Sequence, residues 1–269
     1  MNGIFDLKVL IRGAGELASG VAHRLFLSNI RKIIMVDTEK PTSERRGVSF
    51  SEAIYDGEKM VEGVRGVKVE NVDEAIRLWN SQAIPVMVDP SLSILDVFKP
   101  HVLIDAIMAK RNTGTRKSMA ELVIGLGPGF TAGSDVDAVI ETKEGHNLGK
   151  VIWRGSAEEN TGIPTPIMGY AKERLLIAPS DGVIKLVKDI GDMVERGEIV
   201  AYVGDEPLRS NIDGVLRGIV RDGLFLKRGK KCGDVDPRGV VDYCFTISDR
   251  SRSIAGGVLE AILSFFNHP

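Results

Sequence analysis

The chain has 269 residues, of which 43% are hydrophobic and 27% are charged, and its net charge is −2 at pH 7. This length accommodates a sizeable core and predicts two domains, and the nearly balanced charge excludes a general affinity for nucleic acid. The two cysteines are too few for a disulfide framework. Because no apolar run approaches roughly 18 residues and no basic-then-apolar leader is seen, we expect a cytoplasmic protein without a membrane segment.

Residues 7–37 have the pattern of a strand, a glycine loop, a helix and a second strand. Residues 9–11 are a short apolar run, typical of a strand buried on both faces of a parallel sheet. A helix with one apolar stripe follows the loop, and the second strand, over residues 32–36, ends at Asp37. The loop itself has the form G-x-G-x-x-A and consists of Gly13, Ala14, Gly15, Glu16, Leu17 and Ala18.

This loop has the features of a dinucleotide-binding site. The first glycine permits a tight turn, the second lets the backbone approach a pyrophosphate, and the small Ala18 allows close packing of helix and strand. The phosphates would bind free N–H groups at the helix start, where Glu16 would compete with them. Asp37 would accept a hydrogen bond from a ribose hydroxyl, which favours NAD, although Arg45 and Arg46 leave NADP open. The alternative is the same scaffold with an empty or altered site.

The following segments alternate between strand and helix patterns. We expect buried strands over residues 84–88, 101–107 and 121–126, and helices over residues 72–79 and 91–98. Asn71 is the expected cap of the first of these helices. The alternation predicts an open, Rossmann-like parallel sheet in a nucleotide-binding domain with a β extension, over residues 1–170.

A cluster of cations follows the strand at residues 101–107. Residues 110–117 contain Lys110, Arg111, Arg116 and Lys117 around Asn112 and Thr113. The carboxyl end of a strand is where open α/β sheets bind ligands, and cations with hydroxyl groups suit a phosphate or carboxylate. The alternative is a solvated surface. A second glycine-rich turn, over residues 125–130, either turns the chain or brings backbone N–H groups toward a ligand.

The second half contains an internal repeat. Residues 181–197 recur at residues 213–229, 32 positions later, with their glycines in register. Two short copies cannot bury separate cores, so we expect them to pair about a pseudo-twofold axis. Residues 171–250 resemble the biotinyl and lipoyl carriers, which implies an all-β barrel-sandwich hybrid. The joining segment, residues 204–211, has no lysine for modification, which favours a structural or partner-docking module. A last helix, over residues 251–269, would dock on the core or form a homo-oligomer contact.

Five segments together resemble one known family. They are RGAGELASGVAHRL, VDPSLSIL, DAIMAKRNTGT, IGLGPGFTAGSDVDAVIETKEGHNLGKVIWRGSA and NTGIP. The family is that of the selenium-dependent molybdenum hydroxylase system proteins, which are similar in style to xanthine dehydrogenase accessory factors. The resemblance covers nearly the whole chain. It implies an accessory or maturation role whose partner is a molybdenum hydroxylase apoenzyme or its maturation machinery, and it assigns no catalytic residue.

The sequence thus predicts a small phosphorylated ligand, either NAD(P) or a molybdopterin-type nucleotide. The alternatives are an NAD(P)-dependent oxidoreductase and a non-catalytic nucleotide-sensing protein. No Ser/Tyr/Lys set accompanies the glycine loop, which disfavours the oxidoreductase, and no Cys/His cluster has the spacing of a zinc site. The predicted ligand-binding residues are Gly13, Ala14, Gly15, Glu16, Leu17, Ala18, Asp37, Lys110, Arg111, Asn112 and Thr113.

Overall fold

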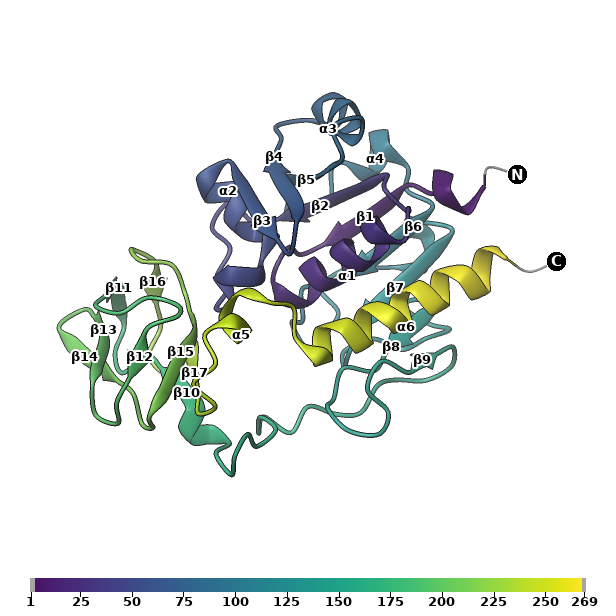
Figure 1. Ribbon diagram of the computed structural model, residues 1–269. Coiled ribbons are helices and arrows are strands. Elements are labelled where there is room, and N and C mark those ends of the chain that lie inside the picture. Colours follow the sequence, from purple (N-terminus) through teal and green to yellow (C-terminus); the bar gives the residue numbers. More distant parts are fainter. Residues whose placement is uncertain (1–2, 268–269) are drawn as a thin grey trace. The chain divides into compact units, whose positions relative to one another are not determined.

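A computed structural model describes residues 3–267, and the chain divides into two compact units (Figure 1). The first unit comprises Met1–Pro41, Ser49–Asn160 and Ile247–Pro269, and the second comprises Thr42–Val48 and Thr161–Thr246. The division differs from the predicted one in two ways. The last helix belongs to the first unit, and a short segment near residue 45 belongs to the second, because contacts between distant parts of the chain decide the boundaries.

The first unit is built on a nine-stranded sheet with the order β3-β4-β5-β2-β1-β6-β7-β8-β9. The seven inner strands, β4-β5-β2-β1-β6-β7-β8 in sheet order, run parallel to one another. The edge strand β3 pairs antiparallel with β4, and the edge strand β9 pairs antiparallel with β8. The strands are β1 Val9–Arg12, β2 Ile33–Asp37, β3 Glu58–Val61, β4 Val64–Lys68, β5 Ala83–Val88, β6 Val102–Asp105, β7 Leu122–Leu126, β8 Ala138–Ile140 and β9 Val151–Ile152.

The helices of this unit follow the sequence pattern in part. They are α1 Glu16–Leu27, α2 Ala53–Asp56, α3 Val72–Trp79, α4 Leu95–Phe98 and α6 Asp249–Phe266. The prediction for α3 is confirmed, including its cap, because the side chain of Asn71 accepts a hydrogen bond from the amide of Glu74 at 3.0 Å. The helix expected over residues 91–98 is shorter, since Asp89 ties residues 91–94 into a turn before α4 begins.

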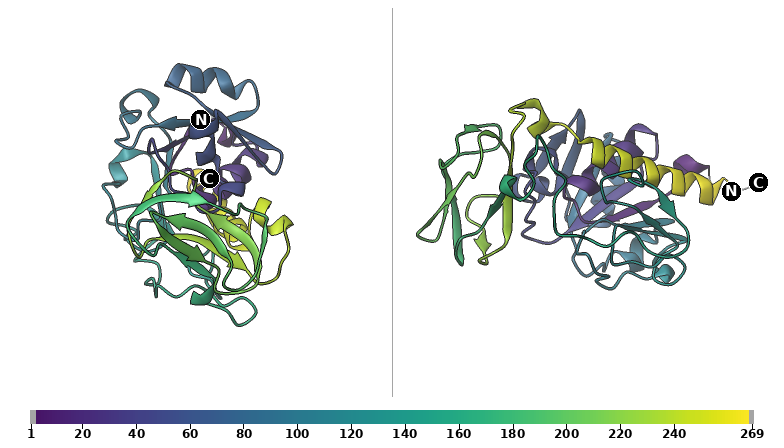
Figure 2. Two further views of the ribbon diagram at one scale, coloured as in Figure 1. Left: turned by 90° about the vertical axis from the view of Figure 1, so that its left-hand side faces the viewer. Right: turned by 90° about the horizontal axis from the view of Figure 1, so that it is seen from below.

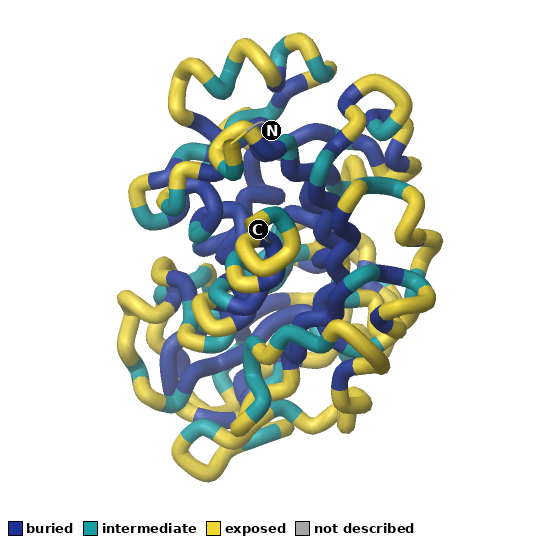
Figure 3. Tube along the Cα trace, turned by 90° about the vertical axis from the view of Figure 1, so that its right-hand side faces the viewer, coloured by how far each residue is buried: buried dark blue, intermediate teal, exposed yellow. Residues whose placement is uncertain are grey.

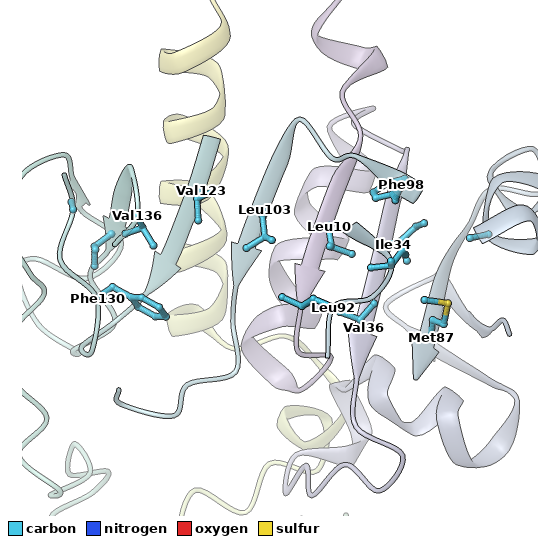
Figure 4. Close-up of a cluster of buried hydrophobic side chains, with 14 of the residues drawn as sticks. Leu10, Ile34, Val36, Met87, Leu92, Phe98, Leu103, Val123, Phe130 and Val136 are labelled. Atoms are coloured by element: carbon cyan, nitrogen blue, oxygen red, sulfur yellow. The ribbon is translucent and has the colours of Figure 1, made fainter. Parts of the chain in front are cut away.

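One face of the sheet carries a continuous apolar core. Leu10, Ile34, Leu103 and Val123 come from four strands and point to the same side (Figure 4). Each is fully buried, and burial of such a side chain contributes roughly 1.5–3 kcal/mol. The central strands are buried along their length, and exposure is concentrated in the connecting loops (Figure 3). The core therefore holds the strand ends, and the loops that follow them, in fixed positions.

The long helix α6 packs closely against the rest of the first unit, with its backbone near that of neighbouring segments. It lies along α1 and strands β7, β8 and β9 (Figure 2), and its apolar face buries Ile254, Val258 and Ile262. A Cβ atom at Gly20 of α1 would overlap the hydroxyl of Ser251, so the absence of a side chain at this position allows the two helices to approach closely. Among the described residues, the last helix thus packs against the first unit through this apolar face.

The second unit contains two four-stranded antiparallel sheets, with the orders β10-β17-β15-β12 and β14-β13-β11-β16. In the internal repeat, the first strand of each copy pairs with the second strand of the other copy, β11 with β16 and β15 with β12. The elements are β10 Leu175–Ile177, β11 Gly182–Leu186, β12 Met193–Val194, β13 Ile199–Val203, β14 Glu206–Arg209, β15 Gly214–Ile219, β16 Phe225–Leu226, β17 Lys231–Asp236 and α5 Asp242–Phe245.

The predicted fold class, a Rossmann-like parallel sheet domain followed by an all-β barrel-sandwich hybrid, is wrong. The sheet of the first unit is mixed, because antiparallel strands close both of its edges. The second unit is formed by two antiparallel sheets. The physical reason is that short apolar runs indicate strands without indicating their direction, which is set by the partner. The hairpin of β3 and β4 was not anticipated at all.

The glycines of α6 test how closely this helix packs. A Cβ atom at Gly257 would overlap the carbonyl oxygen of Gly149, whereas one at Gly256 would meet no atom within 4 Å. Gly257→Ala should therefore lower the free energy of unfolding by about 1–3 kcal/mol. Gly256→Ala should raise it by about 0.5–1 kcal/mol. Urea denaturation measures both values, and equal effects of the two substitutions would contradict this packing.

Candidate functional site: the carboxyl edge of the nine-stranded sheet

The candidate site lies where the parallel strands of the first unit end. The glycine loop follows β1, Asp37 closes β2, and Asp105 closes β6. Since β1 pairs with both β2 and β6 in parallel, these residues lie on neighbouring strands at one edge. This is the edge at which open α/β sheets bind ligands. All the predicted site residues therefore belong to segments at this edge.

The first half of the glycine loop is held by the protein itself. Gly13 has a φ of +103°, and a Cβ atom there would lie 3.1 Å from the carbonyl carbon of Ala106. The amide of Ala14 donates to the carboxylate of Asp37 at 2.7 Å, and its carbonyl accepts from the Ser19 hydroxyl and the Ser51 amide. Gly13 and Ala14 are both buried. This part of the loop shapes the turn and is closed to a ligand.

Asp37 organises the glycine loop. Its carboxylate oxygens accept backbone hydrogen bonds from Ala14 and from Thr38, each at 2.7 Å. Burial raises the pKa of Asp37 above its ordinary value even though these bonds lower it. Folding therefore favours the protonated form of Asp37. The stability that this form contributes is fully present below the unfolded-state pKa and is lost as the pH rises through the folded-state pKa. A ribose hydroxyl would have to share oxygens that are already engaged.

The second half of the loop begins α1. Gly15 is the N-cap and makes no side-chain cap, so the first-turn amides of Glu16, Leu17 and Ala18 are the groups that a helix start offers to an anion. Ala18 is buried, as close packing of the helix requires. The carboxylate of Glu16 accepts a hydrogen bond from the hydroxyl of Ser248 at 3.0 Å. The negative charge of Glu16 therefore lies beside the amides to which an anion would bind.

A buried ion pair supports the cation loop, which we define as residues 110–117. Arg12 ends β1, and its guanidinium contacts the carboxylate of Asp105 at 3.0 Å, with side-chain exposures of 12% and 2%. The same guanidinium donates to the hydroxyls of Thr113 and Thr115 and to the carbonyl of Thr113. Thr115 in turn donates to Asp105 at 2.6 Å. The ends of β1 and β6 therefore anchor this loop.

Asn112 and Thr113 have structural roles within the cation loop. The side-chain oxygen of Asn112 accepts from the amides of Gly114 and Thr115, and its amide group donates to the Thr115 carbonyl. These bonds form a local turn typical of asparagine. Both residues were predicted to bind the ligand directly, and their hydrogen bonds within the chain show that they also hold the loop that carries the cations.

Three of the four cations in the loop are available. Lys110, Arg111 and Arg116 are exposed and make no ion pair with any residue in the range 3–267. Lys117 pairs with Asp137 at 3.1 Å. The second glycine-rich turn supports the loop from beneath, because a Cβ atom at Gly129 would lie 2.5 Å from the backbone nitrogen of Arg111. Gly129 is therefore needed because the backbone of the cation loop packs directly against it.

Arg45 and Arg46, which left NADP open in the sequence, are engaged within the second unit. Arg45 donates to the carbonyl of Tyr243 at 2.8 Å, and Arg46 pairs with Asp189. Neither arginine therefore provides a free guanidinium for a 2′-phosphate.

Sequence reasoning missed the two residues that connect the site, Arg12 and Thr115. The available signal was a charged residue at the end of each of two apolar strands, Arg12 and Asp105, because parallel neighbours place such ends together. Among residues 3–267, no group of three or more His, Cys, Asp or Glu side chains is arranged to hold a metal ion. Within the same range, no helix has both the length and the apolar character required to cross a membrane.

Comparison with known proteins shows a similarity that extends over most of this chain. The chain is 48% identical over 255 residues to the uncharacterized protein YqeB of Escherichia coli (strain K12), covering 95% of this chain and 47% of that protein. The chain thus spans about half the length of the curated relative it matches. No family profile matches the chain.

Solved structures are similar only at a low level. TcdA (CsdL) has a TM-score of 0.33 at 12% identity, covering 98% of this chain and 90% of that one. The product-bound ectoine utilization protein EutE (DoeB) of Ruegeria pomeroyi has a TM-score of 0.28 at 9% identity, covering 85% and 84%. An aspartoacylase family protein of Mesorhizobium loti has a TM-score of 0.26 at 12% identity, covering 79% and 58%. Similarities this weak assign neither a fold nor an activity.

The Arg12–Asp105 pair can be tested by removing one charge. Asp105→Asn keeps the shape of the side chain but leaves the guanidinium of Arg12 buried without a counter-charge. We expect a loss of about 3–5 kcal/mol in the free energy of unfolding and faster tryptic cleavage after Arg111. The control is Asp137→Asn, which removes the charge that pairs with the exposed Lys117 and keeps an oxygen for the Val123 amide. It should cost at most about 1 kcal/mol. Slow cleavage in both variants would show that the pair does not hold the loop.

Glu16 can be tested as a competitor for anions. Glu16→Gln retains an oxygen for the Ser248 hydroxyl but removes the negative charge at the start of α1. Affinity for inorganic pyrophosphate, measured by calorimetry, should rise roughly two- to fivefold, the range of about 0.3–1 kcal/mol for a charge at a helix end. Glu121→Gln, which precedes β7 at the opposite edge of the sheet, should leave the affinity unchanged. An equal response in both variants would place the anion elsewhere.

Proposed function

We propose that the protein binds a nucleotide-bearing or phosphorylated ligand at the carboxyl edge of its nine-stranded sheet, and that it serves in the cytoplasm as an accessory factor for maturation of a molybdenum hydroxylase. One observation carries the binding proposal. The start of α1 and the cation loop follow adjacent parallel strands, and a buried ion pair between Arg12 and Asp105 anchors that loop. Two independent sources of positive potential are thereby held at one edge.

The chemistry of these groups favours phosphate. Arg111 and Arg116 offer planar donor sets that match a phosphate with two hydrogen bonds, whereas Lys110 acts as a point charge. The amides at the start of α1 add donors that carry no net charge. Because Asp37 already accepts two backbone hydrogen bonds, recognition of the ligand would depend more on its phosphate groups than on a ribose. A molybdopterin-type nucleotide and NAD(P) both carry such phosphate groups.

The resemblance of the sequence segments to the selenium-dependent molybdenum hydroxylase system proteins supports the maturation context. The apoenzyme of the hydroxylase or its maturation machinery would then be the partner. A non-catalytic nucleotide-sensing protein would use the same edge for binding alone. Mass spectrometry of small molecules that co-purify with the protein tests the ligand class. Deletion of the gene, followed by assay of hydroxylase activity, separates maturation from sensing, because only a maturation factor is required for active enzyme.

The cation loop provides the mutational test of this proposal. Arg111→Ala removes a guanidinium whose charge-assisted hydrogen bonds contribute roughly 1.5–3 kcal/mol. Binding of the co-purified ligand should therefore weaken by about one to two orders of magnitude, with little change in the melting temperature of the free protein. The matched control is Arg77→Ala, since this exposed arginine of α3 lies before β5, near the amino edge of the sheet. Unchanged affinity in the double variant Lys110→Ala/Arg111→Ala would remove the loop from the site.

A further inference from the structure

A hollow of about 540 Å³ lies on the surface of the second unit. Three segments of the chain contribute to it: the turn before β10 with Lys172 and Glu173, the turn after β12 with Arg196, and the end of β14 with Arg209 and Asn211. These segments are distant in the sequence. The pairing of β13 with β14 places Arg196 near Arg209, and the side chain of Asn211 donates a hydrogen bond to the Leu175 carbonyl at the start of β10. The hollow thus gathers three cations and one acid.

The cations of the hollow differ from most others in this unit. Elsewhere, Lys188 pairs with Glu198 at 2.8 Å and Lys227 pairs with Asp181 at 2.9 Å. By contrast, Lys172 and Arg196 make no ion pair within the described range, residues 3–267. Arg209 donates to the carbonyl oxygen of Gly197 at 2.8 Å, which orients its guanidinium without neutralising it.

The single acid of the hollow, which interacts electrostatically with Lys172, compensates only part of the charge of the three cations. The carboxylate of Glu173 accepts a hydrogen bond from the amide of Ala171 at 2.9 Å, in its own turn. A net positive charge therefore remains, and like charges repel one another unless an anion or water screens them. The planar groups of Arg196 and Arg209 match carboxylates with paired hydrogen bonds.

The shape and lining of the hollow indicate the kind of ligand. Sites for small molecules are typically enclosed and mostly apolar, so that they bury most of the ligand. Here every lining residue except Gly197 carries a polar or charged side chain, and Lys172, Arg196, Arg209 and Asn211 are all exposed. Such a surface suits a chain that remains partly in solvent while its carboxylates contact the cations.

We propose that this hollow binds an acidic segment of a partner protein through its aspartate and glutamate side chains. Lys172 and Arg196 provide the charge, and Arg209, held by the Gly197 carbonyl, provides an oriented guanidinium. This proposal is independent of the ligand site in the first unit.

The test uses the full chain and a fluorescein-labelled hexaglutamate peptide. Fluorescence anisotropy at low salt should show binding that weakens as salt is added, because contacts between exposed charges are screened. The double variant Lys172→Ala/Arg196→Ala should weaken binding about tenfold, as expected for two exposed charge contacts. The matched control is Lys185→Ala/Arg228→Ala, which removes one lysine and one arginine, both exposed residues of the same unit away from the hollow.

Three results would overturn the proposal: no binding of the peptide, equal weakening in both double variants, or displacement of the peptide by an equal concentration of inorganic phosphate, which would indicate a site for small anions. The variant Lys110→Ala/Arg111→Ala should bind the peptide like the unaltered protein. This result would separate the two proposals. Substitutions in the hollow should weaken only binding of the peptide, and substitutions in the cation loop should weaken only binding of the co-purified ligand.

Discussion

The contact between Arg12 and Asp105 is the interaction on which the candidate site depends. The two residues are partners in the register of β1 and β6, so the pair is formed as soon as these strands associate. A buried ion pair is stable only when further hydrogen bonds satisfy its remaining donors and acceptors. Thr113 and Thr115 provide several of these bonds, although the Nε atom of Arg12 stays buried without a partner among the described residues. The cation loop is therefore folded around the pair. The position of Lys110 and Arg111 follows from that folding.

Carboxylates play the same part at other strand ends. Asp89 follows β5 and accepts from the amides of Ser93 and Ile94, and these bonds lower its pKa although burial raises it. Glu141 follows β8 and accepts from three backbone amides, including that of Glu158. A buried carboxylate is costly unless it is hydrogen-bonded, and backbone amides of a following loop are the nearest donors. Most acids at this edge therefore order loops, which leaves ligand binding to the cations and the helix start.

The second unit shows how a repeated sequence forms a single core. Each copy is too short to enclose apolar side chains alone, and the first strand of each copy pairs with the second strand of the other. The shared core includes Ile184 and Leu216, which occupy strands β11 and β15 of the two copies. Exchange of strands makes the two copies inseparable. The turns of the hollow are brought together by other contacts, the pairing of β13 with β14 and the hydrogen bond from the Asn211 side chain to the Leu175 carbonyl.

Several features were determined by the sequence alone. The helix at residues 72–79, its cap at Asn71, and the strand–loop–helix order at residues 9–27 are local, because they depend on side chains within a few positions of each other. The direction of the edge strands, the assignment of α6 to the first unit and the pairing of Arg12 with Asp105 were decided by the tertiary structure. Each of these depends on which distant segment lies alongside, and a short apolar run has the same pattern whichever partner it finds. For the same reason, Asn112 and Asp37 look like ligand-binding residues in the sequence, and only the folded chain shows that their hydrogen bonds are made to its own backbone.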